Sequence, residues 1–129
     1  MADAKVKILL IEDEEMLANM YEVKFQNEGF DITKALDGAA GLELSKTTSP
    51  DLVLLDVIMP KMDGFSVLRA MREDPKTKDL PVILLTNLGQ DEDVAKGKEL
   101  GAIGYLVKAN VTPAEVVESV KRELAKLKK

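Results

Sequence analysis

Three acidic residues of this chain follow apolar runs and could do chemistry together. Glu12 and Asp13 come directly after residues 6–11, and Asp56 comes directly after residues 52–55. A carboxylate at the end of a buried strand costs free energy unless it has a partner. Three carboxylates in one pocket repel one another, and at least one pKa rises unless a cation lies among them. Mg²⁺ suits such a pocket, because it binds one or two carboxylates and completes its shell with water and phosphate oxygens.

A hydroxyl and an ammonium follow two later apolar runs. Thr86 comes after residues 82–85 and Lys108 after residues 102–107, and the sequence contains neither cysteine nor histidine. Thiolate and imidazole chemistry are therefore excluded, and any reaction must use carboxylates, lysine, the hydroxyl groups of serine, threonine or tyrosine, or the backbone. With a metal bound, Asp56 can stay ionised and attack phosphorus, while Thr86 and Lys108 contact the phosphoryl oxygens. The sequence therefore predicts phosphoryl transfer to Asp56.

Alternating strands and helices must position these side chains. Short apolar runs predict strands buried on both faces, and apolar residues at helical spacing predict the helices between them. The last helix is marked by the capping box that Thr112 and Glu115 form around Pro113. Such alternation is typical of an α/β fold, a doubly wound parallel sheet with helices on both faces and right-handed crossovers. We expect strands at residues 6–11, 30–36, 52–55, 82–85 and 102–107, and helices at 14–28, 38–46, 65–72, 91–100 and about 113–128.

The carboxyl ends of the strands form the edge at which such sheets bind ligands. The three carboxylates, the hydroxyl and the ammonium all lie at predicted strand ends, so we expect them to meet in one pocket. Two observations have structural interpretations instead. Asp63-Gly64 is typical of a turn and helix cap, and Glu14 and Glu15 are favourable at a helix N-terminus.

Composition limits the function classes. The 129 residues carry 18 basic and 23 acidic side chains, a net charge of −5, which argues against direct nucleic-acid or anionic-membrane binding. No apolar run approaches the roughly 20 residues that span a membrane. The first residues lack the features of a signal peptide. We therefore expect one domain over residues 1–129 in the cytoplasm, with no membrane insertion.

Four segments resemble the receiver domains of bacterial two-component response regulators. The most specific one ends in Met59-Pro60-Lys61-Met62-Asp63-Gly64, three residues after Asp56. The resemblance covers essentially the whole chain and implies a stand-alone, flavodoxin-like (βα)₅ domain with strand order 2-1-3-4-5. The four segments are residues 8–14, 54–64, 81–86 and 104–108.

The resemblance assigns the metal ligands and the phosphoryl donor. It implies that Asp56 is the phosphoacceptor for the phosphohistidine of a sensor histidine kinase or a phosphotransfer protein. Asp13 and Asp56 would ligate Mg²⁺, or Mn²⁺ in its place, together with the backbone carbonyl of Ile58. Glu12 would act through water. The chain would catalyse only its own phosphorylation and dephosphorylation and would not be an enzyme in the ordinary sense.

The resemblance also implies a signalling face. Thr86 and Lys108 would contact the phosphoryl oxygens, and Thr86 and Tyr105 would switch on phosphorylation. The downstream protein would then bind the face formed by the helix at 91–100, the strand at 102–107 and the last helix. No further domain follows in this sequence, so we expect the signal to leave through that protein surface.

Two residues depart from the family pattern, and two others occupy positions that influence the hydrolysis rate in this family. Ala109 follows Lys108 where a proline after a cis bond is usual, and a cis bond before a non-proline residue costs about 2.5–4 kcal/mol. Asn87 is larger and more polar than the small residue usual after the threonine. Ile58 and Leu88 flank the site and cannot orient water, so we expect a phosphoaspartate that lives longer than in a variant carrying Ile58→Asn and Leu88→Glu.

Three other functions compete with this interpretation. Phosphatases of the haloacid dehalogenase type carry a second aspartate where this chain has Ile58. An FMN carrier needs a hydroxyl- and glycine-rich loop where this chain has four acidic residues, 12–15. A degenerate receiver that binds a partner without phosphorylation is the serious alternative, and Ala109 is the residue that keeps it open.

Overall fold

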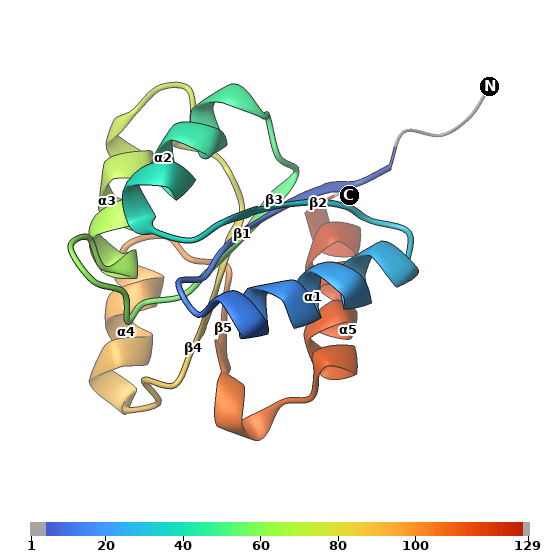
Figure 1. Cartoon of the computed structure of the whole chain (residues 1–129). Helices are drawn as coiled ribbons and strands as arrows, with labels where there is room; N and C mark the ends of the chain where they lie inside the picture. The colour runs from blue at the N-terminus through green and yellow to red at the C-terminus, as the bar shows by residue number, and fades with distance from the viewer. Residues whose placement is uncertain (1–4, 128–129) are drawn as a thin grey trace.

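Within residues 5–127 the fold is a five-stranded sheet covered by five α-helices (Figure 1). The structure is a computed structural model that describes residues 5–127. A short 3₁₀ helix, Lys108–Asn110, follows the last strand. The strands are β1 (Lys7–Ile11), β2 (Asp31–Ala35), β3 (Leu52–Leu55), β4 (Val82–Thr86) and β5 (Gly104–Val107), and the helices are α1 (Glu15–Asn27), α2 (Gly38–Thr47), α3 (Gly64–Glu73), α4 (Asp91–Glu99) and α5 (Pro113–Leu127).

All neighbouring strands pair in parallel, in the order β2-β1-β3-β4-β5. Helices α1 and α5 cover one face of the sheet, and α2, α3 and α4 cover the other (Figure 1). This arrangement confirms the predicted doubly wound α/β fold and its strand order. The order reverses between β1 and β3, which places a crevice at the carboxyl ends of these two strands.

Alternate residues of each central strand supply two separate cores. Ile8 and Leu10 of β1 pack under α1 and α5, whereas Leu9 and Ile11 pack under α2 and α3. Every residue of β3 is buried. Side chains alternate between the two faces of a strand, so a sheet that is covered on both sides needs continuous apolar runs. The apolar runs of the sequence are explained by this requirement.

The sequence predicts helix caps at Asp37, Asp63 and Thr112, and all three form. The Asp37 carboxylate accepts a hydrogen bond from the Ala40 N–H at 2.7 Å, and Asp63 accepts one from the Ser66 N–H at 2.8 Å. Thr112 and Glu115 form the reciprocal capping box, with hydrogen bonds of 2.8 and 3.1 Å. These local contacts satisfy N–H groups that a helix N-terminus leaves without partners.

Helical spacing predicts Leu17, Met20, Tyr21 and Phe25 on the apolar face of α1, and the structure contradicts this prediction at Met20. Met20 is 41% exposed, and Ala18, Tyr21 and Phe25 form the buried side. The rotation of α1 against the sheet turns Ala18, Tyr21 and Phe25 inward and leaves Met20 on the solvent side. Met16, 85% exposed, is likewise on the surface and not in the core.

Some predicted boundaries also moved. The first strand begins at Lys7, one residue later than expected, and the fifth begins at Gly104, two residues later. Leu100 and Gly101 form the turn after α4, and Ala102 and Ile103 connect this turn to β5. Helix α5 extends to Leu127, and the predicted final residue of this helix, 128, lies outside the described residues.

Candidate functional site

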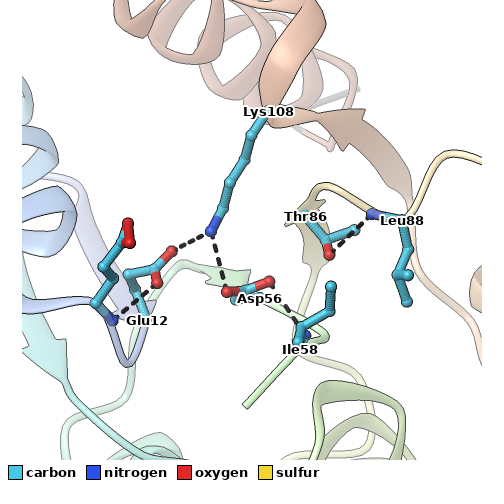
Figure 2. A network of polar contacts seen from close by, with 7 residues as sticks. Glu12, Asp56, Ile58, Thr86, Leu88 and Lys108 are labelled. Carbon is cyan, nitrogen blue, oxygen red and sulfur yellow. Dashed lines mark hydrogen bonds and ion pairs between the residues drawn. The ribbon is translucent and has the colours of Figure 1, made fainter.

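Four strands deliver the predicted site residues to one edge of the sheet (Figure 2). Glu12 follows β1 and Asp56 follows β3, while Thr86 ends β4 and Lys108 follows β5. The register pairs Ile11 with Leu55, so the residues directly after β1 and β3 leave the sheet side by side. The structure thus brings these side chains together because parallel strands end at a common edge.

The three carboxylates form a compact cluster. One carboxylate oxygen each from Glu12, Asp13 and Asp56 lies within 4.8 Å of the other two. Glu12 and Asp56 are buried, at 1% and 5% exposure, and Asp13 is exposed. A set of hard oxygen donors with one side open to water fits Mg²⁺, which keeps several waters in its shell.

Lys108 neutralises part of this cluster. Its Nζ lies 2.6 Å from a Glu12 oxygen and 3.0 Å from an Asp56 oxygen (Figure 2). Burial alone would lower the pKa of Lys108, but the hydrogen bonds to Glu12 and Asp56 together with the negative charges of these two carboxylates outweigh it, and the pKa is raised. Burial raises the pKa of Glu12, while its hydrogen bonds from Lys108 and the Glu14 N–H oppose that shift. The ammonium therefore stays charged and joins two of the three carboxylates.

Lys108 reaches the cluster without an unusual peptide bond. Within residues 5–127 every peptide bond is trans, including the one between Lys108 and Ala109. Lys108 opens the short 3₁₀ helix directly after β5, and its side chain extends from there across the pocket (Figure 2). The missing proline therefore does not prevent contact with Asp56.

Thr86 and Tyr105 meet at a common neighbour, Leu88. The Thr86 hydroxyl, fully buried, accepts a hydrogen bond from the Leu88 N–H at 3.3 Å. The Tyr105 hydroxyl donates a hydrogen bond to the Leu88 carbonyl. Burial raises the pKa of Tyr105, and the carboxylates of Asp93 and Asp56 raise it further. The end of β4 and the ring on β5 are thus linked through one backbone segment.

Ile58 contributes an N–H and an exposed side chain. The N–H donates to an Asp56 carboxylate oxygen at 3.3 Å, which orients the carboxylate (Figure 2). The Ile58 side chain is 54% exposed and lines the pocket with Leu17 of α1. Metal ligation by the Ile58 carbonyl stays a prediction.

Two contacts that shape the pocket were not predicted from the sequence. The Glu14 N–H donates to the second oxygen of Glu12 at 3.0 Å and so fixes that carboxylate. A Cβ on Gly64 would lie 2.1 Å from the Asp56 carbonyl oxygen, so only glycine permits this approach of α3. The glycine beside the Asp63 cap was the available signal, but we interpreted it only as part of a turn.

Residues 8–121 match the family model described as the response regulator receiver domain. The chain belongs to this family. It is 37% identical over 123 residues to the DNA-binding dual master transcriptional regulator RpaA of Synechocystis, an alignment that covers 95% of this chain and 49% of RpaA. It is 39% identical over 102 residues to response regulator PleD of Caulobacter vibrioides, which covers 79% of this chain and 22% of PleD. The receiver domain thus spans half or less of these relatives.

Solved receiver domains have the same fold. The Vibrio cholerae chemotaxis protein CheY4 superposes with a TM-score of 0.86 at 30% identity, over 92% of this chain and 98% of that one. The Francisella response regulator 1452 receiver domain superposes with a TM-score of 0.87 at 32% identity, over 97% of this chain and 100% of that one. Both likenesses extend over nearly the whole receiver fold.

Membership of this family sets the general function. Receiver domains are signalling domains of two-component systems and not classical enzymes, and they interact with histidine kinases or phosphotransfer proteins. Receiver domains bind Mg²⁺ at an acidic pocket, and this chain has an acidic cluster formed by Glu12, Asp13 and Asp56. Among the described helices, none combines the length and the apolar character that crossing a membrane requires.

Proposed function

We propose that this receiver domain is a phosphorylation switch formed by residues 1–129, in which Asp56 accepts a phosphoryl group from a phosphohistidine. The observation that carries the proposal is the position of Lys108, whose ammonium contacts the Asp56 carboxylate at 3.0 Å inside the acidic cluster. A lysine held there stabilises negative charge on oxygens that are transferred to Asp56. A purely structural ion pair would not explain the third carboxylate, Asp13, beside it.

Asp56 would act as the nucleophile. An Asp56 oxygen forms the new bond to phosphorus as the phosphorus–nitrogen bond of the phosphohistidine breaks, and the electron pair leaves with the imidazole. Asp13, Asp56 and the Ile58 carbonyl would hold Mg²⁺, with Glu12 contacting it through water, and the ion would neutralise charge on the phosphoryl oxygens. Lys108 and the Thr86 hydroxyl would bind the remaining oxygens. The same groups would serve the hydrolysis of the phosphoaspartate.

The surface of α1 supports docking of the donor protein beside Asp56. Asp56 is only 5% exposed, so a donor histidine must approach through the mouth of the pocket. Met16, Met20 and Val23 of α1 are exposed, at 85%, 41% and 55%, and their spacing places them along one side of the helix. Leu17, on the same helix, lines the pocket itself. An apolar stripe that adjoins the pocket fits the apolar surface of a sensor kinase or phosphotransfer protein.

The signal would leave through α4, β5 and α5 to a downstream protein in the cytoplasm. Phosphorylation would bias the Thr86–Leu88 segment, and Tyr105 contacts that segment through Leu88. Tyr105 also touches α4, because a Cβ on Gly97 would lie 3.2 Å from the Tyr105 ring and 2.7 Å from Leu84. A change at the pocket would thereby reach α4. We propose no direct contact with nucleic acid for this chain.

The test is the mass of the intact protein after incubation with acetyl phosphate, with and without Mg²⁺. We expect one added phosphoryl group that requires both Mg²⁺ and Asp56, so the Asp56→Asn variant stays unmodified. Failure of the folded wild-type protein with acetyl phosphate and with a phosphohistidine donor would favour the degenerate receiver. In that case Mg²⁺ binding would also be insensitive to Asp56→Asn.

A further inference from the structure

Asn87 lines the phosphoacceptor pocket and has no role in the mechanism described above. Its exposed side chain borders the same hollow as Asp56 and Lys108. Within residues 5–127 the nearby hydrogen bonds engage the Thr86 hydroxyl, the Leu88 backbone and Tyr105, and they leave the Asn87 carboxamide unpaired. An amide beside the reacting carboxylate is therefore free to bind a ligand.

The backbone holds Asn87 firmly on both sides. Thr86 is the last residue of β4 and pairs with Val107 of β5. Leu88 is fixed by two hydrogen bonds, from its N–H to Thr86 and to its carbonyl from Tyr105. The short asparagine side chain has few rotamers to lose, so a contact from this position costs little conformational entropy.

The charge of the pocket indicates what Asn87 can bind. The carboxylates of Glu12, Asp13 and Asp56 lie beside the Lys108 ammonium, which uses two of its three protons in hydrogen bonds to Glu12 and Asp56. A phosphoryl group on Asp56 adds further anionic oxygens that need hydrogen-bond donors. A carboxamide offers two N–H donors without adding charge. We propose that the Asn87 side-chain N–H donates a hydrogen bond to a phosphoryl oxygen on Asp56, which makes Asn87 a further catalytic residue.

This inference rests on the proposed phosphorylation of Asp56 and makes a separate prediction. With acetyl phosphate and saturating Mg²⁺, we expect Asn87→Ala to be phosphorylated roughly tenfold more slowly than wild type, because one donor to a charged oxygen is lost. Asn87→Asp has nearly the same shape but no N–H donor and an added negative charge, so it should be slower still. Mg²⁺ affinity should be unchanged in Asn87→Ala and tighter in Asn87→Asp. Asn110→Ala, an exposed amide outside the pocket, is the matched control.

Binding of beryllofluoride, a phosphoryl mimic, gives a second measurement that needs no turnover. The affinity for beryllofluoride, measured by ¹⁹F NMR, should be roughly tenfold weaker in Asn87→Ala and unchanged in Asn110→Ala. Equal or faster phosphorylation of Asn87→Ala, or wild-type rates in Asn87→Asp, would overturn the donor role. A wild-type protein that neither reacts nor binds beryllofluoride would instead overturn the proposed function, and the role of Asn87 with it.

Discussion

The Lys108 ammonium lies 3.0 Å from the Asp56 carboxylate, although a trans peptide bond joins Lys108 to Ala109. The same ammonium lies 2.6 Å from Glu12. Lys108 thus contacts two of the three carboxylates that a divalent cation would use. Lysine and metal must therefore compete for the same negative charge before phosphorylation, and they must cooperate once phosphoryl oxygens are present.

Substitution of Lys108 should separate these two effects. We expect Lys108→Ala to lower the rate of phosphorylation by acetyl phosphate about 10²-fold, because a donor to the transferred oxygens is lost. The same variant should bind Mg²⁺ more tightly, since no ammonium offsets Glu12 and Asp56. Mass spectrometry gives the rate, and a calorimetric titration gives the affinity. Weaker Mg²⁺ binding in a folded Lys108→Ala protein would contradict the competition.

The lifetime of the phosphoaspartate should depend on the apolar side chains at its entrance. Ile58 is 54% exposed beside Asp56, and Leu88 is half-buried next to Thr86. Neither side chain can orient a water molecule. We therefore expect the phosphoaspartate of the double variant Ile58→Asn, Leu88→Glu to be hydrolysed roughly tenfold faster than that of wild type. Decay of the phosphorylated mass after removal of the donor measures the rate. Ile103→Asn, an exposed apolar residue beside Val82 at the opposite end of the sheet, is the control, and equal decay in the double variant and wild type would refute the idea.

Gly64 should tolerate no side chain. A Cβ there would lie 2.1 Å from the Asp56 carbonyl oxygen and 2.7 Å from the Val57 Cα, both backbone atoms that cannot move aside. We expect Gly64→Ala to destabilise the fold by about 2 kcal/mol or more in urea unfolding and to impair phosphorylation of Asp56. In Gly89→Ala the new Cβ meets Val107 methyl groups at 3.4 Å, an ordinary contact, so its stability should barely change. Similar losses in both variants would argue against a specific clash.

An ion pair between α1 and α5 should give a small pH-dependent stabilisation. The Glu28 carboxylate accepts a hydrogen bond from Lys121 at 3.1 Å and lies 3.4 Å from Lys24. The hydrogen bond from Lys121, and to a smaller extent the one from Lys24, hold the pKa of Glu28 below its ordinary value of 4.5. The stabilisation is therefore present above about pH 4.5 and is lost as the pH falls through the lowered pKa.

Glu28→Gln should consequently melt at a slightly lower temperature than wild type at pH 7. The difference should shrink in high salt and vanish in strong acid. Thermal unfolding followed by circular dichroism at pH 7 and at acid pH makes the comparison. A difference that grows as the pH falls would contradict the pairing.

The sequence by itself determined the elements and the edge at which the site lies. Continuous apolar runs such as Leu52–Leu55 can be buried on both faces only in a covered parallel sheet. The caps at Asp37, Asp63 and Thr112 form between residues three positions apart, so local chemistry is sufficient to predict them. Glu12, Asp56, Thr86 and Lys108 each end or follow a strand, and parallel strands end together.

Only the tertiary structure decided the contacts that depend on distance and direction. Which of Met20 and Tyr21 faces the core depends on how α1 is rotated against the sheet, and spacing along the chain does not fix that rotation. Lys108 is 96 residues from Glu12, and its choice of partners follows from the packing of β5 beside β4. The need for glycine at position 64 arises because the start of α3 touches the Asp56 backbone, a contact that no local pattern records. Such contacts are set by the packing of whole elements, whereas the elements themselves are set by neighbouring residues.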